Sequence, residues 1–203
     1  MRSPSPAIFF DKDGVLVPDE GTLLPQSEFV LEEMVELLSR LRCSGVWKLF
    51  VVTNQAVIAR GLITPQELQQ YFTRLQSTIL KRSAHAYFDK IYYCPHHPHA
   101  NLPEYRVLCE CRKPKAGMLT MAAEEFNLDL KRSYLLGDRV SDVVAANLVG
   151  CKAILCRFDF GTKRVVSPEE LMKMVVTDLS EREEKDKRAF ATIETPLQLL
   201  KYL

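Results

Sequence analysis

The alternation of short apolar runs with helical segments is the feature that most restricts the fold of this 203-residue chain. Six runs have the length and composition of strands, at residues 7–10, 49–52, 90–94, 134–137, 153–156 and 189–193. Spacing, capping signals or composition predict helices at 28–42, 64–82, 116–126 and 141–149, and another starting at 167. Strands that alternate with helices form parallel sheets with right-handed crossovers. The sequence therefore predicts an α/β fold, with three layers (α/β/α) around a central parallel sheet.

Composition excludes several classes of partner. The 27 basic residues nearly balance the 26 acidic residues, so no overall field attracts nucleic acid or a membrane surface. No apolar run is long enough to cross a bilayer, and residues 1–6 lack an apolar signal core. We expect a cytoplasmic monomer with one domain over 1–203 and no separate cap domain. Residues 1–6 are expected to be a frayed lead-in, and 178–188 a charged surface segment.

Polar residues follow three of the predicted strands. The first strand runs into Asp11 and Asp13, with Gly14 next, and Thr53 and Asp138 follow two other strands. Because parallel strands end at one edge of a sheet, these side chains should converge there. Carboxylates at such an edge hold divalent cations through hard oxygen ligands, and Mg²⁺ fits best because it also bridges to phosphate. The pattern therefore predicts a magnesium site for a phosphorylated ligand.

Phosphoryl transfer needs little more than these groups. A carboxylate can attack phosphorus and form an aspartyl-phosphate, while Lys113 supplies positive charge beside it. Each residue alone has an ordinary explanation: Thr53 could turn the chain, Asp142 could be a first-turn helix acid, and Lys113 could lie on the surface. Their coincidence at predicted strand ends favours the catalytic interpretation.

Four potential zinc ligands lie on a long loop without helical or strand periodicity, which we call the zinc loop (residues 94–112). They are three cysteines and one histidine: Cys94, His96, Cys109 and Cys111. Three thiolates and one imidazole complete the tetrahedral set of a structural Zn²⁺ site. His97 and His99 lie nearby and could supply the imidazole instead of His96. The alternative to a metal site is a group of buried thiols beside a surface histidine. The other cysteines are expected to be small core residues, namely Cys43, Cys151 and Cys156.

These motifs resemble the four motifs of the haloacid dehalogenase (HAD) superfamily. They are DKDG at 11–14, TNQ at 53–55, RKP at 112–114 and GDRVSD at 137–142. Longer stretches are similar to the D-glycero-D-manno-heptose 1,7-bisphosphate 7-phosphatase family, over about residues 7 to 165. These stretches are VVTNQ at 51–55, IARG at 58–61, YYCPHHP at 92–98 and CECRKP at 109–114.

The resemblance implies roles for individual residues. Asp11 is expected to be the nucleophile, Asp13 the general acid and base, and Lys113 the cation that neutralises the phosphate. Thr53 and Asn54 are expected to bind the transferring phosphate.

The resemblance also implies metal ligands and substrate contacts. Mg²⁺ is expected on Asp11, Asp138 and the backbone carbonyl of Asp13, with Asp142 behind them or bound through water. Arg60 and Arg112 are expected to hold the rest of a phosphorylated sugar.

Two departures from the family pattern concern the substrate. The loop at 15–24 lacks the Asn and Tyr usual in heptose enzymes, and Ala56-Val57 replaces the usual Ser-Gly. Histidinol-phosphate phosphatase therefore stays as an alternative, although its gap between the two ligand pairs is usually shorter. A polynucleotide 3′-phosphatase should show a basic track, which the neutral balance argues against. A non-catalytic zinc-stabilised binding module is disfavoured by the intact set of acids and lysine.

Overall fold

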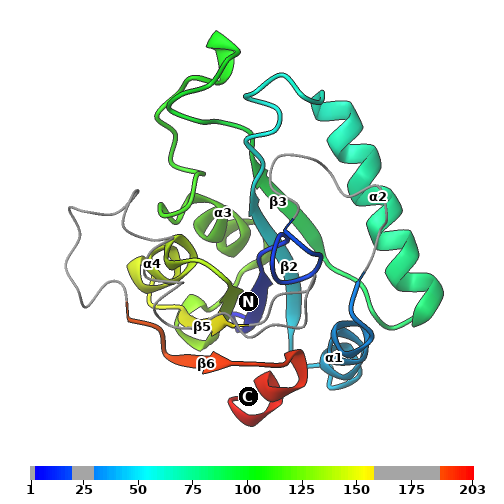
Figure 1. Ribbon diagram of the computed structural model, residues 1–203. Helices are drawn as coiled ribbons and strands as arrows, with labels where there is room; N and C mark the ends of the chain where they lie inside the picture. Colours follow the sequence, from blue (N-terminus) through cyan, green and yellow to red (C-terminus); the bar gives the residue numbers. More distant parts are fainter. Residues whose placement is uncertain (1–2, 20–29, 158–187) are drawn as a thin grey trace.

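The computed structural model describes residues 3–19, 30–157 and 188–203. Six parallel strands form one sheet in the order β3-β2-β1-β4-β5-β6 (Figure 1). The strands are β1 (Ala7–Phe10), β2 (Lys48–Asn54), β3 (Lys90–Cys94), β4 (Tyr134–Gly137), β5 (Lys152–Cys156) and β6 (Ala191–Ile193). The order reverses at β1, whose neighbours are β2 and β4. The end of β1 is therefore the switch point where ligands bind in open α/β sheets.

Helices cover both faces of the sheet. They are α1 (Glu32–Cys43), α2 (Pro65–Arg82), α3 (Gly117–Phe126) and α4 (Val140–Leu148), with 3₁₀ turns η1 (Pro103–Tyr105), η2 (Leu130–Arg132) and η4 (Pro196–Lys201). Strand alternation separates two apolar cores: Ile8 and Phe10 face α1, α2 and η4, whereas Phe9 faces α3 and α4. In Figure 1 the helices α1 and α2 lie on the side of the sheet away from α3 and α4. The predicted three-layer α/β/α fold is confirmed.

Element boundaries agree with the sequence prediction to within a few residues. The predicted capping box at the start of α2 is present: Thr64 Oγ1 accepts a hydrogen bond from the Glu67 amide at 3.2 Å, and the Glu67 carboxylate accepts one from the Thr64 amide at 2.8 Å. The largest difference among strands is β2, which continues through Thr53 and Asn54 because both pair with β3. Thr53 therefore lies inside a strand, not beyond its end.

Two expectations about peripheral residues are not met. Ser5 pairs with Leu128, and its amide and carbonyl bond to Asn127 and Asp129 at 3.0 and 2.9 Å, so order begins earlier than the expected lead-in. Cys43, the last residue of α1, is exposed, so it is not a core residue. Cys151 and Cys156 are buried as predicted.

Some predictions fall outside the described residues. These are the loop at 20–26, the start of a helix at 28, the helix starting at 167 and nearly all of the charged segment 178–188. The single-domain assignment includes them and so stays a prediction. In the described ranges, no helix is both long and apolar enough to cross a membrane.

Candidate active site and metal centres

Three carboxylates converge where β1 and β4 end. Asp11 follows β1, Asp138 follows β4, and Asp142 lies on the first turn of α4; one oxygen from each lies within 4.8 Å of the others. Because β1 and β4 are neighbours, the sheet itself brings Asp11 and Asp138 together. The amide of Asp11 donates to the carbonyl of Leu136 on β4 at 2.8 Å, which fixes this register. We call these three residues the carboxylate centre.

Gly14 makes this close approach possible. Its φ of +73° lies in the left-handed region, and a Cβ added there would stand 2.4 Å from Asp138 Oδ2. Any side chain at this position would push the Asp138 carboxylate away. The glycine that follows the acidic pair is therefore required by the carboxylate centre as well as by the turn.

Lys113 is the cation of the carboxylate centre. Its ammonium lies 3.0 Å from Asp11 Oδ1 and 2.5 Å from Asp142 Oδ1, and it donates to the carbonyl of Val52 at 2.9 Å. The side chain is 3% exposed, so these contacts are largely shielded from water. The two carboxylates outweigh the effect of burial and raise the pKa of Lys113. Lys113 therefore stays charged beside Asp11 and Asp142.

Asp11 and Asp142 are buried and Asp138 is 20% exposed, and beside one lysine these three carboxylates carry an excess of two negative charges when all are ionised. Burial and repulsion by Asp11 and Asp142 raise the pKa of Asp138, and burial raises that of Asp142 to about 6 although Lys113 opposes it. Within the described part of the chain, Asp138 Oδ1 is buried without a hydrogen-bond partner. A divalent cation would neutralise this excess and occupy that oxygen, so the residues fit Mg²⁺.

Asp13 lies beside the carboxylate centre and is held separately. Its Oδ1 pairs with Lys12 Nζ at 2.5 Å, and its Oδ2 accepts from Gln55 Nε2 at 2.9 Å. The carboxylate is 27% exposed and so can reach a bound ligand. Burial raises the pKa of Asp13, and Lys12 offsets this only in part. A raised pKa suits a group that must donate a proton.

Sequence reasoning missed the residues that hold these groups. Lys12 is 1% exposed and lies over the Tyr71 ring at 5.0 Å, and Gln55 also donates to Thr53 Oγ1 at 2.9 Å. Arg139 pairs with Asp19 at 2.5 Å and lies 4.0 Å from Asp138 Oδ2. The only sequence signal was their position inside or next to a motif.

The predicted phosphate-binding residues lie near Lys113 and the strand ends, whereas the two predicted substrate-binding arginines lie in other surroundings. Thr53 is buried at the same strand ends, and the side chain of Asn54 is bonded to the backbone of Lys113. Arg112 donates to the carbonyl of His96 at 3.1 Å, beside the cysteines. Arg60 is half-buried and forms no ion pair with any residue that the structure describes.

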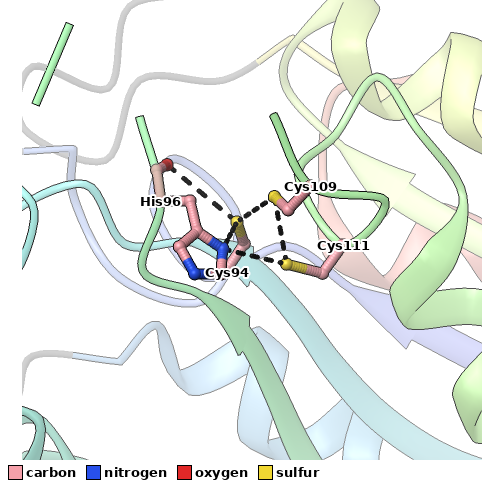
Figure 2. Close-up of side chains that lie close together, drawn as sticks. All are labelled: Cys94, His96, Cys109 and Cys111. Atoms are coloured by element: carbon pink, nitrogen blue, oxygen red, sulfur yellow. Dashed lines mark hydrogen bonds between the residues drawn. The ribbon is translucent and has the colours of Figure 1, made fainter. Parts of the chain in front are cut away.

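The four predicted zinc ligands converge in the zinc loop (Figure 2). Cys109 Sγ lies 3.5 Å from Cys94 Sγ and 3.3 Å from Cys111 Sγ. His96 Nδ1 lies 3.8 Å from Cys94 Sγ and 3.6 Å from Cys111 Sγ. A tetrahedral Zn²⁺ ion separates two sulfurs by about 3.8 Å, and a sulfur from a nitrogen by about 3.6 Å. The cluster therefore has the size of a zinc site.

The cysteines of this cluster differ in acidity. Burial raises the pKa of Cys94. Burial acts in the same direction on Cys109, but hydrogen bonds from the Cys111 and Cys94 thiols and from the backbone outweigh it and lower its pKa. A thiol whose neighbours donate to it is the one that ionises first, and thiolates are the form that binds metal.

The sequence matches a family model and several known phosphatases. A family model described as "HAD-hyrolase-like" matches residues 110–182. The D-glycero-beta-D-manno-heptose-1,7-bisphosphate 7-phosphatase of Escherichia coli K12 is 36% identical over 174 residues, which cover 83% of this chain and 86% of that protein. The enzyme of the same name from Haemophilus ducreyi is 40% identical over 147 residues, covering 72% and 79%.

A solved structure agrees on the fold. The D,D-heptose 1.7-bisphosphate phosphatase from B. bronchiseptica, complexed with magnesium and phosphate, superposes with a TM-score of 0.72 at 23% identity. The match covers 98% of this chain and 99% of that one. The sequence relatives, together with the family model, show that the chain belongs to the D-glycero-beta-D-manno-heptose-1,7-bisphosphate 7-phosphatase family of the HAD superfamily.

Proposed function

We propose that this protein is a phosphoric monoester hydrolase that removes the C7 phosphate of a heptose 1,7-bisphosphate through an aspartyl-phosphate. The observation that carries the proposal is the carboxylate centre, in which buried Lys113 orients Asp11 at the switch point of the sheet. A carboxylate held by a lysine beside a cation site suits phosphoryl transfer, where positioning and charge neutralisation supply most of the catalysis.

The reaction takes place in two steps. Asp11 attacks phosphorus, the bond to the sugar oxygen breaks, and Asp13 gives that oxygen its proton. Asp13 then takes a proton from water, which attacks the phosphorus of the aspartyl-phosphate, releases phosphate and restores Asp11. Thr53 and the backbone amide of Asn54 bind the phosphate oxygens, and Lys113 holds Asp11 in line throughout. The partial exposure of Asp13 supports its role, because the proton must reach the substrate.

Mg²⁺ would be held by Asp11, Asp138 and the backbone carbonyl of Asp13, and it would supply positive charge to the transferring phosphate. Asp142 would lie behind these ligands. Its contact with Lys113 supports that position, since one oxygen is already paired with the ammonium at 2.5 Å.

Zn²⁺ would have a structural role on Cys94, His96, Cys109 and Cys111. Four protein ligands fill its tetrahedral coordination and leave no position for a reactant. Cys111 lies two residues before Lys113, so the ion would also steady the catalytic lysine. Cysteines that bind zinc and form no disulfide suit a reducing compartment such as the cytoplasm.

The substrate is proposed to be a sugar that carries a second phosphate. Arg112, whose guanidinium lies next to the zinc cluster, is the better-placed candidate to bind that group, and Arg60 is the second. Histidinol phosphate is the competing substrate, because the loop at 15–24 departs from the heptose pattern.

Steady-state kinetics on a matched monophosphate and bisphosphate test whether the protein recognises the second phosphate. We expect the bisphosphate to be preferred, and Arg112→Ala to lower its kcat/KM by about 10- to 100-fold, because a bidentate contact to phosphate is lost. The same variant should leave the monophosphate nearly unaffected. Equal kcat/KM for both substrates, unchanged by Arg112→Ala, would contradict the role of the second phosphate and leave the phosphatase assignment standing.

A further inference from the structure

We propose that Asn54 is a positioning residue for Lys113 and that its side chain does not bind the transferring phosphate. This inference rests on the proposed function, because it concerns how the lysine of that site is held. The family resemblance implies that Asn54 binds the transferring phosphate, and the proposal excludes the side chain from that contact.

The side-chain amide of Asn54 matches the peptide backbone of Lys113. Its Oδ1 accepts from the Lys113 amide at 3.0 Å, and its Nδ2 donates to the Lys113 carbonyl at 2.9 Å. Two bonds in opposite directions fix the plane of the amide. An anion offers no donor to Oδ1, so this pair of bonds is complementary to a peptide group and not to phosphate, and it leaves only the second Nδ2–H of the side chain outside it.

Strand β2 thereby holds Lys113 at both ends. The backbone of Lys113 is fixed by Asn54, while its ammonium donates to the carbonyl of Val52, two residues earlier on the same strand. The other two contacts of the ammonium go to Asp11 and Asp142. A lysine has a long flexible side chain, so fixing its backbone limits the positions that the charge can reach. Release of the backbone should therefore displace the charge from Asp11.

The zinc cluster is the alternative route by which Asn54 could act. Asn54 pairs with Cys94 in the register of β2 and β3, and the neighbouring amide of Gln55 donates to the Cys94 carbonyl at 2.8 Å. A change at Asn54 could therefore disturb a zinc ligand. Any test must measure zinc content together with activity.

A double-mutant cycle between Asn54 and Lys113 tests the proposal. Phosphate release by the full chain in Mg²⁺ is compared among wild type, Asn54→Ala, Lys113→Ala and the double variant. We expect Asn54→Ala alone to lower kcat/KM by about 10- to 100-fold, as for a small displacement of a catalytic group. In the Lys113→Ala background the same change should have less than about a twofold effect, because the group that it positions is gone.

Two outcomes would overturn the proposal. If the two losses multiply, Asn54 acts on the phosphate independently of Lys113. If Asn54→Ala loses its zinc, as measured by metal analysis of the purified variant, the effect passes through the zinc cluster.

Calorimetric titration with inorganic phosphate in Mg²⁺ measures the affinity for phosphate of the same four proteins, and so gives the coupling between Asn54 and Lys113 without turnover. If phosphate binding shows the coupling but wild type releases no phosphate from any substrate, the proposed function fails and the positioning role of Asn54 stands. If wild type is active and binding shows no coupling, the positioning role fails and the function stands.

Discussion

The carboxylate centre and the zinc cluster each bring potential metal ligands within 4.8 Å, but they are built in different ways. The carboxylate centre draws on segments more than a hundred residues apart, joined because β1 and β4 are neighbours in the sheet. The zinc cluster draws on four residues between 94 and 111 and lies on a loop that projects beyond the sheet (Figure 1). The carboxylate centre therefore depends on the pairing of strands in the sheet, whereas the ligands of the zinc cluster all come from one short stretch of the chain.

The two sites also differ in whether their ligands leave coordination positions open. Carboxylates at the sheet edge leave coordination positions for water and phosphate, and they repel one another until a cation binds. Three thiols and an imidazole fill a tetrahedral ion completely. Removal of magnesium should therefore cost activity while the fold persists, whereas removal of zinc should cost local structure first.

The largest expected effect is on turnover. Asp11→Asn should lower kcat at least about a thousandfold, because an amide cannot form the acyl phosphate. Its zinc content and melting temperature should stay close to those of wild type, since the shape of the side chain is kept. Metal analysis and thermal unfolding provide the control. Appreciable activity in Asp11→Asn would show that Asp11 is not the nucleophile.

The zinc cluster should give the opposite pattern. Cys109→Ala should lose zinc and several degrees of melting temperature, with a smaller loss of kcat through the loosened Lys113. Cys43→Ala is the matched control, because this exposed thiol lies outside the cluster. Zinc content and thermal unfolding are measured for both variants. If Cys109→Ala keeps its zinc and its stability, the cluster is not a metal site.

The pH dependence of magnesium stabilisation should be the smallest effect. Burial raises the pKa of Asp138, a proposed Mg²⁺ ligand, and raises that of the neighbouring Asp142 from 3.8 to about 6, so the folded metal-free protein binds more protons than the unfolded chain between pH 3.8 and about 6. Its stability therefore falls as pH rises through this window. Mg²⁺ competes with these protons, so it should raise the melting temperature by several degrees at about pH 7.5 and by less than about half as much at about pH 5.

Asp138→Asn is the control for that measurement. The variant keeps the size of the side chain but removes a charged ligand, so it should abolish most of the magnesium shift at the higher pH. An equal shift at both values of pH, or a shift that survives Asp138→Asn, would mean that Mg²⁺ stabilises the protein elsewhere.

Sequence predicts the sheet well because short buried runs are unambiguous when helices separate them. It places Asp11 and Asp138 correctly at strand ends, since their position follows from strand direction alone. The end of β2 was harder to predict. Thr53 and Asn54 are polar and would suit a turn, and only pairing with Tyr93 and Cys94 extends the strand.

Side-chain partners could not be predicted in the same way. Asn54 and Lys113 are 59 residues apart, and nothing in either motif shows that their backbone and amide groups meet. The burial of Lys12 could not be predicted either, because a lysine between two acids is typical of a surface segment. These contacts depend on tertiary packing, whereas motif spacing reports only on neighbours in the chain.

We propose that the carboxylate centre hydrolyses a terminal sugar phosphate with Mg²⁺. The most direct test is phosphate release from D-glycero-D-manno-heptose 1,7-bisphosphate by the zinc-loaded protein, with and without Mg²⁺, and identification of the remaining phosphate by ³¹P NMR. We predict Mg²⁺-dependent release of one phosphate, with the C1 phosphate retained. Release of the C1 phosphate would contradict the assigned substrate orientation, and no release from this or any other phosphomonoester would contradict the account as a whole.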